Sequence, residues 1–169
     1  MSDWTETLPT VAALLSAVAG SKDGNPLTRA EAVEEVAQTA RVVEDLGRPP
    51  RVLWVDARPS NNCDERTVMQ RLGVLVERST STEEALVKIA ARGPCDVIIS
   101  DMGRPPDPRA GYAPLDQLRS QRLETPYVIY ASSRRQEHFD ESVRHGAIGC
   151  TNRPDELIDM VRAALSVAG

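Results

Sequence analysis

Two aspartates and an arginine follow short apolar runs of the sequence, and their side chains suit the binding of cations and anions. Asp56 ends "RVLWVD", Asp101 ends "CDVIISD", and Arg153 comes directly after "AIGCTN". Two carboxylates and a guanidinium brought together could hold a divalent cation and an anion. Asp at such a junction also commonly caps the helix that follows, so position alone leaves both interpretations open.

The elements that would bring these residues together are predicted from Arg51 onward. The runs "RVLWV", "VLVER", "DVIIS", "YVIYA" and "AIGCT" are short and apolar, and a segment with helical periodicity follows each one. This alternation predicts an α/β fold, a doubly wound five-stranded parallel sheet with helices on both faces. Ligands of such sheets bind at the carboxyl ends of the strands, so Asp56, Asp101, Ala131, Ser132 and Arg153 are expected on one rim.

Two amphipathic helical patterns precede the alternating part. The first has an apolar stripe from Leu8 to Val18 and is expected to end at Gly20, whereas the second opens with Thr28 and Glu31 at the spacing of a capping box. Two helices alone cannot bury both stripes. The hairpin is therefore expected to pack on the rest of the chain or to form a four-helix homodimer.

A "DLGRPPR" segment separates the two parts, because glycine and proline end a helix there. We expect an N-terminal helical hairpin over residues 1–48 and the sheet domain over residues 49–169. A length of 169 residues suits one ordinary domain with a small addition.

Composition excludes several classes of function. A net charge of −5 argues against a binder of nucleic acid, which would need a basic face. The sequence has no apolar run near the roughly 20 residues that span a membrane. Three cysteines without a CxxC pair are typical of reduced thiols in the cytoplasm. There is no Gly-rich phosphate loop, GxSxG or HExxH, so the common enzyme signatures are absent.

Four segments resemble the receiver domain of two-component response regulators: "RVLWVDARPSNN", "CDVIISDMGRP", "TPYVIYASS" and "GAIGCTNRPDEL". The resemblance covers about residues 51–168 and implies a flavodoxin-like, receiver-type sheet. It also implies that Asp101 corresponds to the aspartate that accepts a phosphoryl group from a histidine kinase. Pro105 matches the proline that follows that aspartate.

The same resemblance shows a degenerate site. Where the family has a second acid for Mg²⁺ beside Asp56, this chain has Ala57. Ala131 replaces a Thr or Ser that contacts the phosphoryl group, Cys150 replaces an aromatic switch residue, and Arg153 replaces a lysine. The metal ligands that remain are Asp56 and Asp101, which predicts weak Mg²⁺ binding at most and no other cofactor. Arg153 is expected to pair with Asp101 or Asp56 instead of with a phosphate.

The segment between Asp101 and Gly111 is longer than the resemblance leads us to expect. It carries three prolines together with Arg104 and Arg109, and it is either a stiff cationic rim for recognition or a rigid connector.

These features favour a non-enzymatic pseudo-receiver, a protein-interaction module that signals to other proteins of a pathway without phosphorylation. One alternative is a divergent response regulator that is phosphorylated on Asp101. A second alternative is an enzyme that binds a small molecule or nucleotide on a flavodoxin-like sheet.

Overall fold

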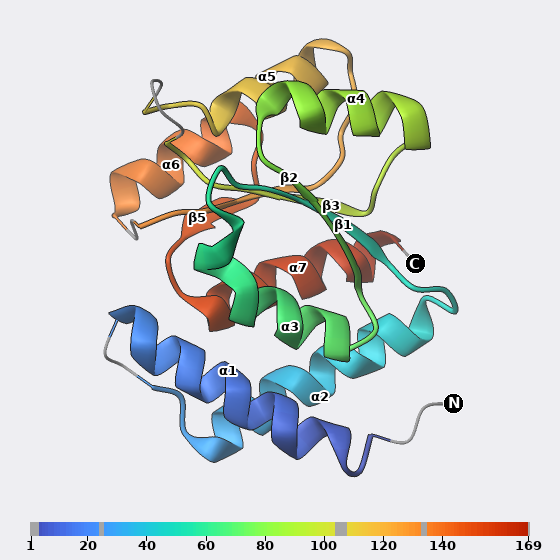
Figure 1. The fold of residues 1–169 in the computed structure, drawn as a ribbon, viewed down its shortest axis with the longest axis vertical. Helices are drawn as coiled ribbons and strands as arrows, with labels where there is room; N and C mark the ends of the chain where they lie inside the picture. The colour runs from blue at the N-terminus through green and yellow to red at the C-terminus, as the bar shows by residue number, and fades with distance from the viewer. Residues whose placement is uncertain (1–3, 24–25, 104–107, 133–134, 169) are drawn as a thin grey trace.

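The computed structural model describes residues 4–23, 26–103, 108–132 and 135–168 and has a sheet covered by helices on both faces (Figure 1). Its strands are β1 (Arg51–Val55), β2 (Leu75–Ser79), β3 (Val97–Ser100), β4 (Tyr127–Tyr130) and β5 (Gly149–Thr151). Its helices are α1 (Thr7–Asp23), α2 (Arg29–Asp45), the 3-10 turn η1 (Pro59–Asn62), α3 (Cys63–Arg71), α4 (Thr82–Arg92), α5 (Tyr112–Ser120), α6 (Gln136–His145) and α7 (Pro154–Ala168). None of the described helices has the length and apolarity that crossing a membrane demands.

The sheet is parallel, with the strand order β2-β1-β3-β4-β5. This confirms the predicted five-stranded, doubly wound sheet. The chain leaves β1 in one direction and β3 in the other, so the crevice of such a fold lies where these two strands end. The pairing of Val55 with Ser100 brings the ends of β1 and β3 level with one another, and the pairing of Tyr130 with Thr151 does the same for β4 and β5.

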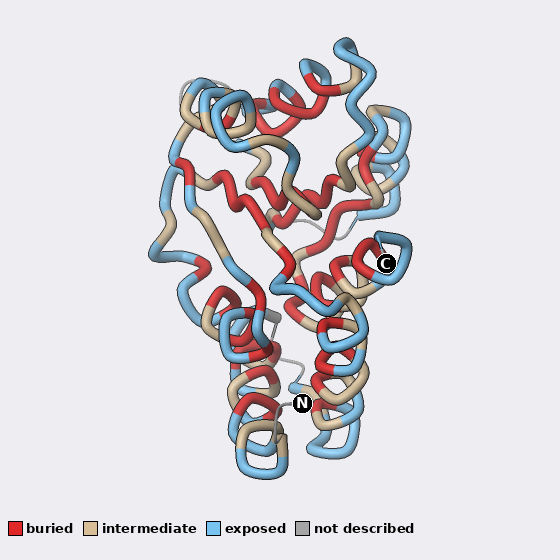
Figure 2. The backbone as a smooth tube through the Cα atoms, turned by 90° about the vertical axis from the view of Figure 1, so that its right-hand side faces the viewer, coloured by how far each residue is buried: buried red, intermediate tan, exposed pale blue. Residues whose placement is uncertain are grey.

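Alternating side chains of the central strands divide the core into two parts. Trp54 and Ile99 face one part, which α3 and α7 cover, and Leu53 and Ile98 face the other, which α4 and α5 cover. Figure 2 shows buried residues along the strands and on the inner sides of the helices. A sheet buried on both faces explains why these strands are continuous apolar runs in the sequence.

The N-terminal hairpin packs against α3 and α7, on the side of these helices away from the sheet (Figure 1). Its inward residues belong to the same apolar cluster as those of α3 and α7; they are Val11, Ala12, Leu15, Ala32, Val36, Ala40 and Val43. The chain itself therefore covers both apolar stripes. Of the two arrangements expected for the hairpin, packing on the sheet domain is the one found.

Helix α1 is longer than predicted, because it runs to Asp23 and includes Gly20. A Cβ atom at Gly20 would lie 3.1 Å from the Cβ of Pro26. Gly20 therefore allows the chain after the helix to pass close by, and it does not mark the end of the helix as predicted.

Polar contacts add to the apolar packing of the hairpin. Arg162 of α7 donates hydrogen bonds from Nη1 to Glu35 Oε2 at 2.9 Å and from Nη2 to Asp159 Oδ1 at 2.6 Å. Burial and the nearby Asp159 raise the pKa of Glu35 to about 7 and outweigh the opposite effect of Arg162. Helix α2 is thus joined to α7 by a network that includes one carboxyl group, that of Glu35, with a pKa near neutral pH.

The shared core predicts that truncation within the hairpin destabilises the whole domain. Val36 is fully buried, so Val36→Ala removes two buried methyl groups and leaves a cavity. We expect a loss of about 2 kcal/mol in the free energy of unfolding, measured by urea titration. Val167→Ala is the matched control, since Val167 is 86% exposed. Equal effects of the two substitutions would contradict a shared core.

Glu35 predicts a dependence of stability on pH. Its pKa is raised from the ordinary 4.5 to about 7. Between these two pH values, the folded state therefore holds a proton that the unfolded state has lost. The stability that Glu35 contributes therefore falls as pH rises from 4.5 to about 7.

We expect the free energy of unfolding of Glu35→Gln, relative to that of the unmodified protein, to be higher at about pH 8 than at about pH 5. Urea titrations at the two pH values measure this difference. Glu34→Gln is the control for the removal of an exposed charge from the same helix. A difference that is the same at both pH values would show that Glu35 does not titrate in this range.

Candidate functional site

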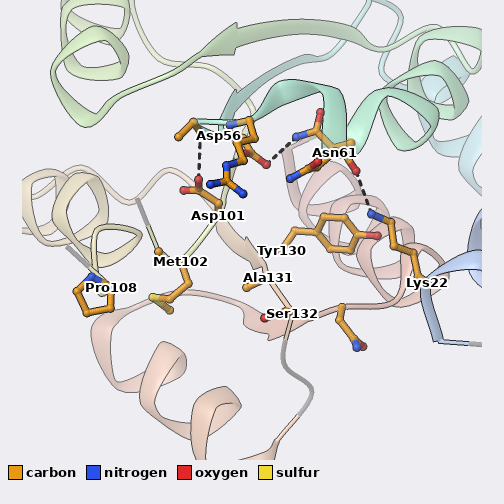
Figure 3. Close-up of a pocket in the computed structure, with 14 residues that line it drawn as sticks. Lys22, Asp56, Asn61, Asp101, Met102, Pro108, Tyr130, Ala131 and Ser132 are labelled. Carbon is orange, nitrogen blue, oxygen red and sulfur yellow. Dashed lines mark hydrogen bonds between the residues drawn. The ribbon is translucent and has the colours of Figure 1, made fainter. Parts of the chain in front are cut away.

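The carboxyl ends of β1, β3 and β4 border a cavity of about 1030 Å³. Figure 3 shows Asp56 and Asp101 toward one end of it and Lys22 toward the other, with Tyr130 between them. The described residues that line it are Lys22, Asp56, Ala57, Arg58, Asn61, Asn62, Asp101, Met102, Gly103, Pro108, Tyr130, Ala131, Ser132 and Asn152. The structure thus brings together Asp56, Ala57, Asp101, Ala131 and Ser132, as expected from their places at strand ends.

The turn that follows β1 holds the carboxylate of Asp56. Oδ1 accepts a hydrogen bond from the backbone N of Arg58 at 2.7 Å, and Oδ2 accepts one from Nδ2 of Asn62 at 2.9 Å. Asn62 is buried, and its Oδ1 accepts from Nε of Arg66 at 2.6 Å. Both carboxylate oxygens of Asp56 therefore hold the turn between β1 and η1, one through a local bond to the backbone of Arg58 and the other through the side chain of Asn62.

Asp101 is held by β1 and by the turn after it. Its backbone N donates to the carbonyl of Val55 at 2.9 Å, and its Oδ2 accepts from the backbone N of Ala57 at 3.1 Å. The residue is half-buried. At the position where the resemblance calls for a second acid, the chain thus contributes a backbone donor to Asp101.

Gly111 packs directly on the backbone of Asp101. Its N donates to the carbonyl of Met102 at 2.6 Å, and its own carbonyl accepts from the hydroxyl of Tyr127 at 2.8 Å. A Cβ atom at Gly111 would lie 2.2 Å from the Asp101 carbonyl oxygen. Only glycine fits there without a shift of the Asp101 segment.

The loop before Gly111 is described in part. Arg104 and Pro105 lie outside the described residues. Arg109 pairs with Glu141 of α6 and lies over the ring of Tyr112 at 5.1 Å. Tyr112 in turn stacks on His145, with 3.8 Å between ring centroids. Arg109 is therefore engaged with α6 rather than presented as a cation of the rim.

Cys150 and Arg153 are not among the described residues that line the pocket, although both were expected there. Cys150 is buried in β5, and burial raises the pKa of its thiol to about 11. Arg153 is 6% exposed, and its Nε donates to Oδ1 of Asp155 at 2.8 Å. The expectation that Arg153 would pair with Asp101 or Asp56 is therefore corrected: its Nε pairs with the carboxylate of Asp155, two residues away on α7.

Several solved structures that are similar to this chain are receiver domains of response regulators. The Francisella response regulator 1452 receiver domain is 25% identical over 71% of this chain and 99% of its own, with a TM-score of 0.62. The chemotaxis response regulator CheY4 of Vibrio cholerae is 27% identical over 69% of this chain and 98% of its own, with a TM-score of 0.58. The chain has the receiver fold of response regulators.

A CheY-like receiver domain protein from Methanospirillum hungatei JF-1 is similar in fold, at 19% identity and a TM-score of 0.59. Each of these three similarities spans about 70% of this chain and nearly the whole of the other chain. No protein-family model and no curated protein matches the chain. The receiver fold that the resemblance of four short segments implied is thus confirmed.

The residues of this receiver fit Mg²⁺ poorly. Within the described ranges, no group of three or more His, Cys, Asp or Glu side chains is placed to hold a metal ion. Mg²⁺ requires near-octahedral oxygen ligands at short distance. Asp56 and Asp101 supply two carboxylates, and both oxygens of Asp56 already accept hydrogen bonds from η1.

Lys22 is a pocket residue from outside the receiver-like part of the chain, and the sequence did not reveal it. It belongs to the last turn of α1 and reaches the receiver pocket from the N-terminal hairpin. A lysine near the end of an amphipathic helix is common, and nothing in the spacing links it to β1 or β4. Only the packing of the hairpin on α3 brings it to the site.

Gly111 gives a test of how tightly the loop is held against Asp101. Gly111→Ala would place Cβ at 2.9 Å from the Cα of Met102 as well as against Asp101. We expect a loss of about 1–3 kcal/mol in stability and displaced amide resonances of Asp101 and Met102 by NMR. Gly103→Ala, in the same loop, would meet only an ordinary contact at 3.5 Å and is the control. A Gly111→Ala protein as stable as the control would refute the close packing.

Proposed function

We propose that this chain is a signal-transduction protein whose receiver domain acts as a phosphorylation-independent protein-interaction module. The observation that supports this most is the state of Asp56. Its two oxygens accept hydrogen bonds from Arg58 and Asn62, while the neighbouring position carries Ala57. The acidic pair that would hold a divalent cation is thereby reduced to one carboxylate engaged in the local turn.

Transfer of a phosphoryl group to Asp101 depends on such a cation. The carboxylate and the donor both carry negative charge, and catalysis of this transfer consists largely of positioning and of charge compensation by metal ions and cationic side chains. Arg153 faces Asp155, so it does not provide that compensation in this conformation. Without it, attack by Asp101 meets uncompensated repulsion.

The response to phosphorylation would also lack its usual parts. Ala131 has no hydroxyl to bond a phosphoryl oxygen, and Cys150 has no ring that could move between two positions. A ligand shifts a conformational equilibrium only when it binds the two states with different affinity. Without the hydroxyl at position 131 and the ring at position 150, a phosphoryl group on Asp101 would change the conformation of the surface little.

The proposed partners are other proteins of a signalling pathway, and a non-enzymatic role in the cytoplasm accompanies this proposal. The negative net charge disfavours nucleic acid as a partner. We propose that residues 1–48 form a hairpin unit and residues 49–169 a receiver unit, and that the two units share one apolar core. A homodimer through the apolar stripes of the hairpin would require those stripes to leave α3 and α7.

The proposal is tested by treating the protein with Mg²⁺ and acetyl phosphate, and separately with Mg²⁺ and beryllofluoride. We expect no increase in intact mass and no change in the fluorescence of the buried Trp54. The positive control is the triple variant Ala57→Asp, Ala131→Thr and Arg153→Lys, which restores three of the four residues that the resemblance calls for and leaves Cys150 unchanged. It should form an adduct that Asp101→Asn abolishes in the same background.

An adduct on the unmodified protein that is lost in Asp101→Asn would overturn the proposal in favour of a divergent phosphorylatable receiver. A nucleotide that remains bound through purification would instead support an enzyme on this sheet.

A further inference from the structure

The last turn of α1 meets the receiver at the edge of the Asp101 pocket. Nζ of Lys22 donates a hydrogen bond to the backbone carbonyl of Asn61 at 2.9 Å and lies 3.4 Å from Oε2 of Glu65. It also lies 5.9 Å from the centroid of the Tyr130 ring, at the end of β4. One side chain of the hairpin therefore reaches η1, α3 and the rim of the sheet. Figure 3 shows its hydrogen bond to Asn61 and the neighbouring ring of Tyr130.

The turn that Lys22 contacts is the one that holds both aspartates. Asn62, next to Asn61, donates to Oδ2 of Asp56, and the N of Arg58 donates to Oδ1. The N of Ala57 donates to Oδ2 of Asp101. The backbone of residues 57–62, together with its hydrogen bonds to Lys22, Asp56 and Asp101, thus connects the hairpin to the two carboxylates.

We propose that Lys22 is a positioning residue for the Asp56 and Asp101 pocket, and that docking of the hairpin and the geometry of this pocket are coupled. The coupling does not depend on whether Asp101 accepts a phosphoryl group, so it stands apart from the function proposed above. Since coupling between sites is reciprocal, a protein that draws α1 away from α3 would alter the pocket, and a ligand of the pocket would alter the docking of the hairpin.

A simpler role for Lys22 is to neutralise Glu65. Glu65 is 3% exposed, and a carboxylate buried to this extent without a cation destabilises a protein strongly. In that case the contact with Asn61 would be incidental. The two roles make different predictions once the charge of Glu65 is removed.

The test measures amide hydrogen exchange of Ala57 and Arg58 by NMR, since these two amides donate to Asp101 and Asp56. Lys22→Ala should speed their exchange by a factor in the roughly 5- to 150-fold range typical of coupled sites. The double variant Lys22→Ala with Glu65→Gln has no buried charge left to neutralise and should show the same acceleration. Lys22→Arg keeps both the charge and the donor and should retain most of the protection.

Lys88 of α4 offers a matched control, because its Nζ also contacts a carboxylate, that of Glu84 at 3.0 Å, and a backbone carbonyl, that of Arg78. Lys88→Ala should leave the exchange of Ala57 and Arg58 unchanged. Recovery of normal protection in the double variant would mean that Lys22 serves Glu65 alone and would overturn the proposal. Unchanged exchange in Lys22→Ala would do so as well.

Discussion

The hydrogen bonds that tie Asp56 to the turn after β1 are the constraint on which the rest of the site depends. They use both oxygens of a carboxylate that the receiver fold places beside Asp101, and they fix the backbone of Arg58 and the buried amide of Asn62. The adjacent Ala57 then presents its N–H to Asp101. The rim is thus stabilised by protein donors at the place where a cation would otherwise balance the two charges.

The N-terminal hairpin extends this arrangement. Because α1 packs along α3, its last turn reaches η1, and the apolar core that joins α1 and α2 to α3 and α7 holds it there. The hairpin therefore takes part in both the core and the pocket of the receiver. A receiver without the hairpin would lack the Lys22 side chain, which lines the pocket.

The sequence was sufficient for the fold and for the places of Asp56, Ala57, Asp101, Ala131 and Ser132, but not for those of Cys150 and Arg153 or for the hydrogen-bond partners of the site. Five apolar runs with helical patterns between them allow few topologies, and in a parallel sheet the residues after each strand must meet at one edge. The partner of Arg153 depends on the direction of one side chain, and Asp155 on the next helix competes with Asp101 for it. Lys22 is close to β1 and β4 only through packing between helices, a contact that leaves no local pattern in the sequence.

Asp101 has structural reasons to be present that do not involve phosphate. Its backbone N donates to the carbonyl of Val55, and its carboxylate accepts a hydrogen bond from the backbone N of Ala57. Its carbonyl oxygen packs against the backbone of Gly111. The carboxylate is the acceptor for the amide of Ala57 at the junction of β1 and η1, a bond that an apolar side chain could not make. An aspartate at the end of the third strand is therefore weak evidence for phosphoryl transfer. The stronger evidence lies in whether its neighbours are free to bind a cation, and here the oxygens of Asp56 are already engaged.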